Sequence, residues 1–148
     1  MFGYSLSRDE ERAILEIMGR VATADREVTD REKQFIVEVS HDFDVSAEGI
    51  FALPEGRGVE AIAERFSEDT ARKIALVFTI RLAFVDGLYD SDEWLGVRRL
   101  GDLLMIPDGT VADLEDWVRR GLEWEEEGRA LMGRPSKWSV SPARRPDT

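Results

Sequence analysis

The chain has 148 residues, the size of one ordinary domain, and 43% of them are apolar, which is enough for a hydrophobic core. It contains no cysteine and a single histidine, His41, so disulfides, thiolate nucleophiles and multi-histidine metal sites are excluded. The net charge of −11 is uneven: residues 128–148 carry five basic residues against one acidic residue, which leaves −15 for residues 1–127. A body this acidic repels phosphates, which argues against nucleic acid as a partner.

The sequence predicts a cytoplasmic protein. Its first residues lack the basic segment and apolar run of a secretory signal. The most apolar stretch, 74–85, is interrupted by Arg81 and is shorter than the roughly 20 residues that cross a bilayer. We therefore expect no direct membrane insertion.

The first half of the chain contains two capping boxes, which predict where helices begin. Ser7 with Glu10, and Thr29 with Glu32, have the S/T-x-x-E spacing in which each side chain accepts a hydrogen bond from the other residue's backbone N–H. Apolar residues recur at helical spacing after each box. We therefore expect helices over 8–24, 30–42 and, after a turn and a Pro- and Gly-containing loop, 59–66.

The second half predicts a central helix and two more beside it. Residues 68–85 are apolar on nearly every side, which is typical of a helix in the middle of a bundle. The next helix, starting near 90, is expected to bury Leu95, and the last, starting near 107, is expected to bury Trp117. Trp94 and Trp124 fall off these apolar stripes, so they should be exposed and offer a surface to a partner.

No stretch of the sequence shows the sustained alternation of a strand, so the expected fold class is all-α. We expect a compact bundle of about 6–7 helices in residues 1–127. Residues 128–148 are basic, polar and proline-containing, and are predicted to be a disordered tail.

The sequence also contains an internal repeat. Displacing it by 61 residues registers the two halves without a gap, and the helix starts, loops and apolar positions coincide. The identical pairs are Leu15 with Leu76, Arg20 with Arg81, Ala22 with Ala83, Asp25 with Asp86, and Glu32 with Glu93. Each unit reads as helix, acidic loop, helix, so we expect two equivalent hairpins whose acidic loops turn toward a common region.

The repeated loops supply the candidate site. In each, an aspartate is followed seven positions later by a glutamate, and the aspartate comes just after a helix C-terminus, where the macrodipole is already negative. A hard cation such as Ca²⁺ or Mg²⁺, which takes oxygen ligands, would offset that repulsion. The predicted ligands of such a weakly bound divalent cation are Asp86, Asp90, Glu93, Asp25 and Glu32.

A purely structural interpretation stays open beside the metal site. Glu32 and Glu93 both occupy the fourth place of a capping box, and this alone explains them. The loops are not EF-hands, because the twelfth residue counted from Asp86 is Val97, where a bidentate glutamate is required. A general acid/base pair of carboxylates would need a cleft, of which the sequence gives no sign. We therefore expect no enzyme, no catalytic residues and no organic cofactor.

At these two loops the sequence resembles the tellurite-resistance TerB family and the TerB-like domain of some membrane-anchored J-domain co-chaperones. The resemblance is carried by 22–32, Ala-Thr-Ala-Asp-Arg-Glu-Val-Thr-Asp-Arg-Glu, and 83–93, Ala-Phe-Val-Asp-Gly-Leu-Tyr-Asp-Ser-Asp-Glu. The family pattern is an alanine-rich segment, Asp-Gly, a variable and an apolar residue, three variable residues and Glu, present twice. Arg26 stands where the family has glycine, which weakens the match of the first loop.

The resemblance, which covers about residues 10–122, implies a helical bundle whose paired acidic loops bind divalent cations. It also implies an interaction module for bacterial stress response with protein partners, including membrane-associated ones. The alternative is a protein-interaction or co-chaperone-type scaffold in which the acidic motifs act only as helix caps.

Overall fold

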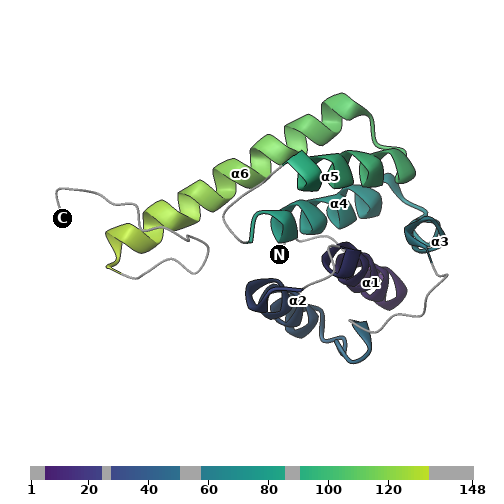
Figure 1. The fold of residues 1–148 in the computed structure, drawn as a ribbon, viewed down its shortest axis with the longest axis horizontal. Coiled ribbons are helices and arrows are strands. Elements are labelled where there is room, and N and C mark those ends of the chain that lie inside the picture. Colours follow the sequence, from purple (N-terminus) through teal and green to yellow (C-terminus); the bar gives the residue numbers. More distant parts are fainter. Residues whose placement is uncertain (1–5, 25–27, 51–57, 86–90, 134–148) are drawn as a thin grey trace.

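The computed structural model describes residues 6–24, 28–50, 58–85 and 91–133. Within these ranges the chain forms six helices and no strand (Figure 1). The helices are α1 (Arg8–Ala24), α2 (Asp30–Phe43), α3 (Val59–Ala63), α4 (Asp69–Ala83), α5 (Ser91–Leu103) and α6 (Asp108–Leu131). The fold is therefore an all-α bundle, as the sequence predicts. None of the helices seen in these ranges has the length and apolarity needed to cross a membrane.

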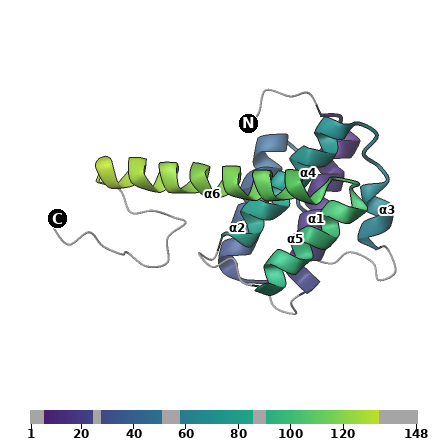
Figure 2. The ribbon, with the colours of Figure 1, turned by 90° about the horizontal axis from the view of Figure 1, so that it is seen from above.

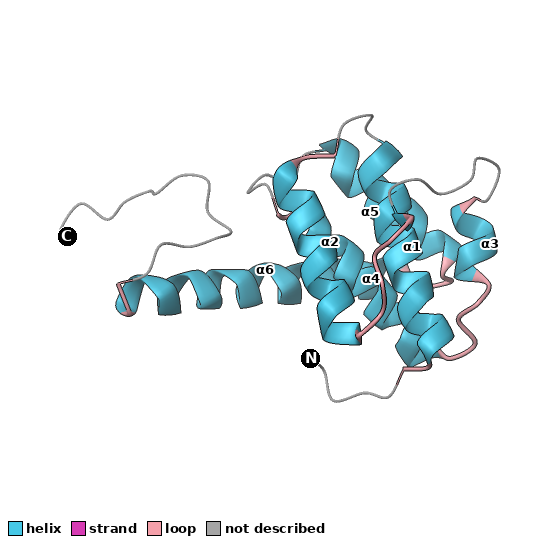
Figure 3. Ribbon diagram, turned by 90° about the horizontal axis from the view of Figure 1, so that it is seen from below, coloured by secondary structure: helices cyan, strands magenta, loops and turns pink. Residues whose placement is uncertain are grey.

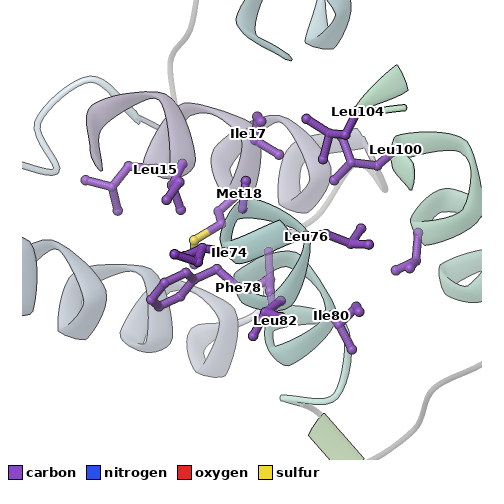
Figure 4. Close-up of a cluster of buried hydrophobic side chains, with 14 of the residues drawn as sticks. Leu15, Ile17, Met18, Ile74, Leu76, Phe78, Ile80, Leu82, Leu100 and Leu104 are labelled. Carbon is purple, nitrogen blue, oxygen red and sulfur yellow. The ribbon is translucent and has the colours of Figure 1, made fainter. Parts of the chain in front are cut away.

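Helix α4 forms the centre of the bundle. It contacts α1, α2, α5 and α6, and ten of its fifteen residues are buried. Figure 4 shows Leu76 pointing from α4 toward the side where Leu100 of α5 lies, and Phe78 pointing from α4 to the opposite side. Phe78 also meets Phe43 of α2 edge to face, with ring centroids 5.3 Å apart. An α-helix that is apolar on all sides is stable in water only when other helices cover it, and here four do.

The two predicted hairpins are present. Helices α1 and α2 form one, α4 and α5 the other, and the pairs occupy neighbouring positions in Figure 1. When the bounds of α1 and α2 are displaced by 61 residues, 8–24 becomes 69–85 and 30–43 becomes 91–104. These ranges agree within two positions with those of α4 and α5. The capping box predicted at the start of α1 is made: Ser7 N–H donates to Glu10 Oε1 at 2.9 Å, and Glu10 N–H donates to Ser7 Oγ at 3.0 Å.

The second helix of each hairpin ends in the same way. Asp44 and Met105, 61 residues apart, both have left-handed backbone, with φ of 54° and 59°. The next N–H donates to the carbonyl five residues back: Val45 to Ser40 at 3.0 Å and Ile106 to Gly101 at 2.8 Å. This is the hydrogen-bonding pattern of a Schellman motif, with an apolar residue after the left-handed one. The repeat therefore extends to backbone geometry, although no residue in this turn is shared between the copies.

Helix α6 extends beyond the bundle. Its three buried residues, Val111, Glu115 and Val118, all lie in its first half, and no residue from 119 to 133 is buried. Figures 2 and 3 show the remainder of the helix projecting away from the other five. The prediction that Trp117 belongs to the core is wrong: its side chain is 48% exposed although the next residue, Val118, is buried, because Trp117 lies on a side of α6 that the other described helices leave open. Trp94 and Trp124 are exposed, as predicted.

Gly19 of α1 lies so close to Ile50 that a larger residue would not fit without strain. A Cβ added there would lie 2.6 Å from both the carbonyl oxygen and Cγ2 of Ile50. We expect Gly19→Ala to lower the free energy of unfolding by about 1–3 kcal/mol, since overpacking outweighs the gain in helix propensity. Chemical denaturation measures the change. Gly96→Ala is the matched control: no atom lies within 4 Å of its added Cβ, so it should gain up to about 1 kcal/mol. Equal effects of the two substitutions would contradict this packing.

Candidate functional site

The glutamate of the first repeated motif caps its helix. Glu32 N–H donates to Thr29 Oγ1 at 3.1 Å, and Thr29 N–H donates to Glu32 Oε1 at 2.9 Å. The predicted capping box is therefore confirmed for α2. A carboxylate offers about four acceptor sites, so capping a helix and binding a cation are not mutually exclusive roles for one glutamate.

The glutamates of both motifs, Glu32 and Glu93, line one cavity of about 450 Å³. The C-terminal ends of α1 and α4, the first residues of α2 and α3, and α5 along most of its length form its walls. Val21 and Leu82, which are also related by the repeat, line it as well. Two pairs of equivalent positions of the two hairpins thus meet at the cavity, and the rest of its lining comes mainly from α5, with α3 added from outside the repeat.

The polar groups of this cavity are mixed in charge. The carboxylates of Glu32, Glu60 and Glu93 share its walls with the guanidinium groups of Arg20 and Arg99, and the other lining residues are apolar apart from Gly96. Glu32 and Glu93 are half-buried, whereas Glu60 and Arg99 are exposed. Both half-buried glutamates lie in the first turn of a helix, where the positive end of the macrodipole stabilises a negative charge.

Three of the five predicted ligands, Asp25, Asp86 and Asp90, lie outside the described residues, as does Arg26. Among residues that the structure does describe, no three acidic or histidine side chains are grouped closely enough to hold a metal ion. Within the described residues, Glu32 and Glu93 therefore make no complete metal site by themselves.

The two arginines that the repeat relates, Arg20 and Arg81, face different neighbours. Arg20 lines the cavity, whereas its counterpart Arg81 faces α6, with its Nη2 3.6 Å from Oε1 of Glu125. Burial lowers the pKa of Arg81, and the charges of Glu125 and Asp42 act in the opposite direction. The two hairpins are thus equivalent in backbone but not in the charges they carry into their surroundings.

The sequence analysis missed part of this site. Glu60 and Arg99 lie outside the repeated motifs, so no pattern associated them with the acidic loops. Leu95 was predicted to be buried, and this is wrong: its side chain is 51% exposed and lines the cavity. At about 100° per residue, Leu95 lies on nearly the opposite side of α5 from the buried Val97 and Leu100, so it lines the cavity instead of packing in the core.

A comparison with protein-family models, with curated proteins and with solved structures finds no match to the chain.

Proposed function

We propose that the protein is a non-enzymatic, TerB-like interaction module of the bacterial stress response that binds a divalent cation, Ca²⁺ or Mg²⁺, at the cavity between its two hairpins. The observation that carries the proposal is that Glu32 and Glu93, related by the internal repeat, line the same cavity. The loops that begin with Asp25 and Asp86 supply the further carboxylates that a hard cation requires. Cation binding would then fix the two loops relative to each other and present them to a protein partner in the cytoplasm.

The charges around the site support this proposal. The chain has net charge −11, so a cation is attracted to it over a longer range than the cavity itself. The arginines in the cavity wall, Arg20 and Arg99, offset part of the local negative charge. A site so balanced should bind weakly, with a dissociation constant of about 0.1–1 mM. The non-catalytic part of the proposal rests on the sequence, which provides no cysteine and only the exposed His41.

A second candidate function is a scaffold for protein partners in which the acidic motifs are helix caps only. The completed capping box of Thr29 and Glu32 favours it, because the glutamate has a structural use without any ion. This candidate predicts the same fold and the same exposed tryptophans, and it differs from the first only in having no affinity for cations.

Calorimetric titration of the full chain with Ca²⁺ and with Mg²⁺ separates the two candidates. We expect saturable binding and a rise in melting temperature that grows with cation concentration. Glu93→Gln should weaken binding about tenfold. Glutamine can also occupy the fourth position of a capping box, so this substitution removes the charge and remains compatible with the box that the sequence predicts at Glu93.

Glu123→Gln is the control, since it removes one exposed carboxylate of α6 away from the cavity. It should leave the affinity unchanged. If neither heat nor a shift in melting temperature is seen at about 10 mM of either cation, the cation proposal fails and the scaffold remains.

A further inference from the structure

From its middle to its C-terminal end, α6 carries an exposed stripe in which large side chains alternate with glycines. At successive spacings of four, three, four and three residues the stripe contains Trp117, Gly121, Trp124, Gly128 and Leu131. Its three large residues are 48%, 75% and 83% exposed. Spacings of three and four residues repeat every seven, which is the pattern of a helix that packs along another helix.

Within the part of the chain that the structure describes, no close contact requires either glycine of this stripe. A Cβ at Gly121 would meet no atom within 4 Å, and one at Gly128 would only touch the end of Met132 at 4.0 Å. Glycine lowers helix stability more than any residue except proline, and both glycines lie inside a helix of 24 residues. Among the described residues no contact compensates for this loss, whereas a large side chain from a partner helix could occupy the space.

From this pattern we propose that α6 pairs antiparallel with α6 of a second copy of the chain. When the helices are aligned so that Trp124 lies opposite Gly121 of the partner, Trp117 lies opposite Gly128 of the partner. The two-fold axis repeats both contacts, so that every tryptophan of the stripe faces a glycine. A parallel pair would instead place tryptophan against tryptophan and leave the glycine layers unfilled.

The charges beside the stripe are complementary in the same antiparallel alignment. Arg120 and Glu127 flank the stripe on one side, at the heptad positions that meet each other in antiparallel pairs. Arg120 of each copy then lies beside Glu127 of the other, which gives two pairs of opposite charge. Both residues are exposed in the single chain, so the pairing requires no rearrangement of the core.

The area available is adequate for a specific dimer. Four tryptophans, two from each copy, expose about 600 Å² in total at the observed fractions. Leu131 and the stems of the flanking charged residues bring the buried area toward the roughly 1,000 Å² expected of a specific interface. The paired segment, 117–131, is about 21 Å long and lies largely clear of the bundle, as Figure 2 shows for α6.

Sedimentation equilibrium of the full chain tests this pairing. We expect a dimer at about 100 µM, and Gly121→Leu should raise the dimer dissociation constant about tenfold or more, because its side chain would collide with Trp124 of the partner. Within the single chain the same substitution meets open space and improves helix propensity, so helicity and melting temperature measured below the dissociation constant should not fall. Gly109→Ala, also in open space on α6 but off the stripe, should leave the dimer intact.

Charge reversal tests the alignment. Arg120→Glu alone and Glu127→Arg alone should each weaken the dimer, and the double substitution should restore it. A chain that stays monomeric at about 100 µM overturns the proposal. A dimer that survives Gly121→Leu, or whose charge reversals show no rescue, also overturns it, because such a dimer would use another face or another alignment.

Discussion

Replacing Leu76 with alanine should lower the free energy of unfolding by about 2–5 kcal/mol, one of the largest effects of any single substitution in this chain. Leu76 has no exposed surface and lies in the middle of α4, the helix that four others cover. Truncation removes its transfer free energy and leaves a cavity that the surrounding helices cannot close. Chemical denaturation followed by circular dichroism gives the change in the free energy of unfolding.

Leu95→Ala provides the matched control, since it removes the same atoms from a leucine that is 51% exposed. We expect a loss of less than about 1 kcal/mol. Both leucines lie inside a predicted helix, but only Leu76 has buried residues on both sides of it in the sequence. If both substitutions cost the same, the central position of α4 would be wrong.

Replacing Arg65 with methionine should cost about 3 kcal/mol, because it leaves a buried carboxylate without its main partner. Glu16 of α1 is only 3% exposed, and its Oε2 lies 2.9 Å from Nη1 of Arg65. Arg65 also reaches Asp9, with its Nη2 2.6 Å from Oδ1. The hydrogen bond to Asp9, followed by that to Glu16, raises the pKa of Arg65, so the guanidinium stays charged throughout the accessible pH range.

Lys73→Met is the control for Arg65→Met. Lys73 Nζ lies 2.8 Å from Asp69 Oδ2, a similar distance, but both side chains are well exposed. We expect its removal to cost less than about 0.5 kcal/mol. Replacing Glu16 and Arg65 together with methionine should cost less than Arg65→Met alone, because no buried charge is then left unpaired. A double variant less stable than the single one would contradict this explanation.

The sequence was informative about the fold because its local signals agree with one another. The boxes of Ser7 with Glu10 and Thr29 with Glu32 start helices where predicted, and the all-apolar segment became the central α4. The failures, Leu95 and Trp117, have one cause, since each is apolar but lies on another side of its helix than the buried residues. At about 100° per residue, Leu95 is roughly opposite the buried Val97, and Trp117 is turned by about 100° from the buried Val118.

The buried ion pairs were missed, although the sequence contains a signal for one of them. Glu16 stands inside the run Ala-Ile-Leu-Glu-Ile-Met, where every neighbour is buried, so a carboxylate on that face had to find a cation. Its partner Arg65 lies 49 residues away beyond α3, and only the tertiary structure identifies it. The tertiary structure is likewise needed to pair Glu115 of α6 with Arg98 of α5, whose Nη2 lies 2.9 Å from Oε1 of Glu115.

The candidate site was predictable only as far as the repeat reaches. The 61-residue repeat correctly associated Glu32 with Glu93, because equivalent hairpins packed together bring equivalent positions to one place. It could not supply Glu60, since α3 belongs to neither hairpin, nor indicate that Arg20 and Arg81 would face different neighbours. Whether Asp25, Asp86 and Asp90 complete a ligand set stays a prediction.

The central claim is that the two repeated hairpins build one shared cation site. It is tested most directly by counting the ions bound per chain and by measuring how a substitution in each hairpin changes their affinity. Calorimetric titration with Ca²⁺ should give one ion per chain, and Glu32→Gln and Glu93→Gln should each weaken that same binding event about tenfold. Two ions per chain, each sensitive to only one of the two substitutions, would mean separate sites and would contradict the claim.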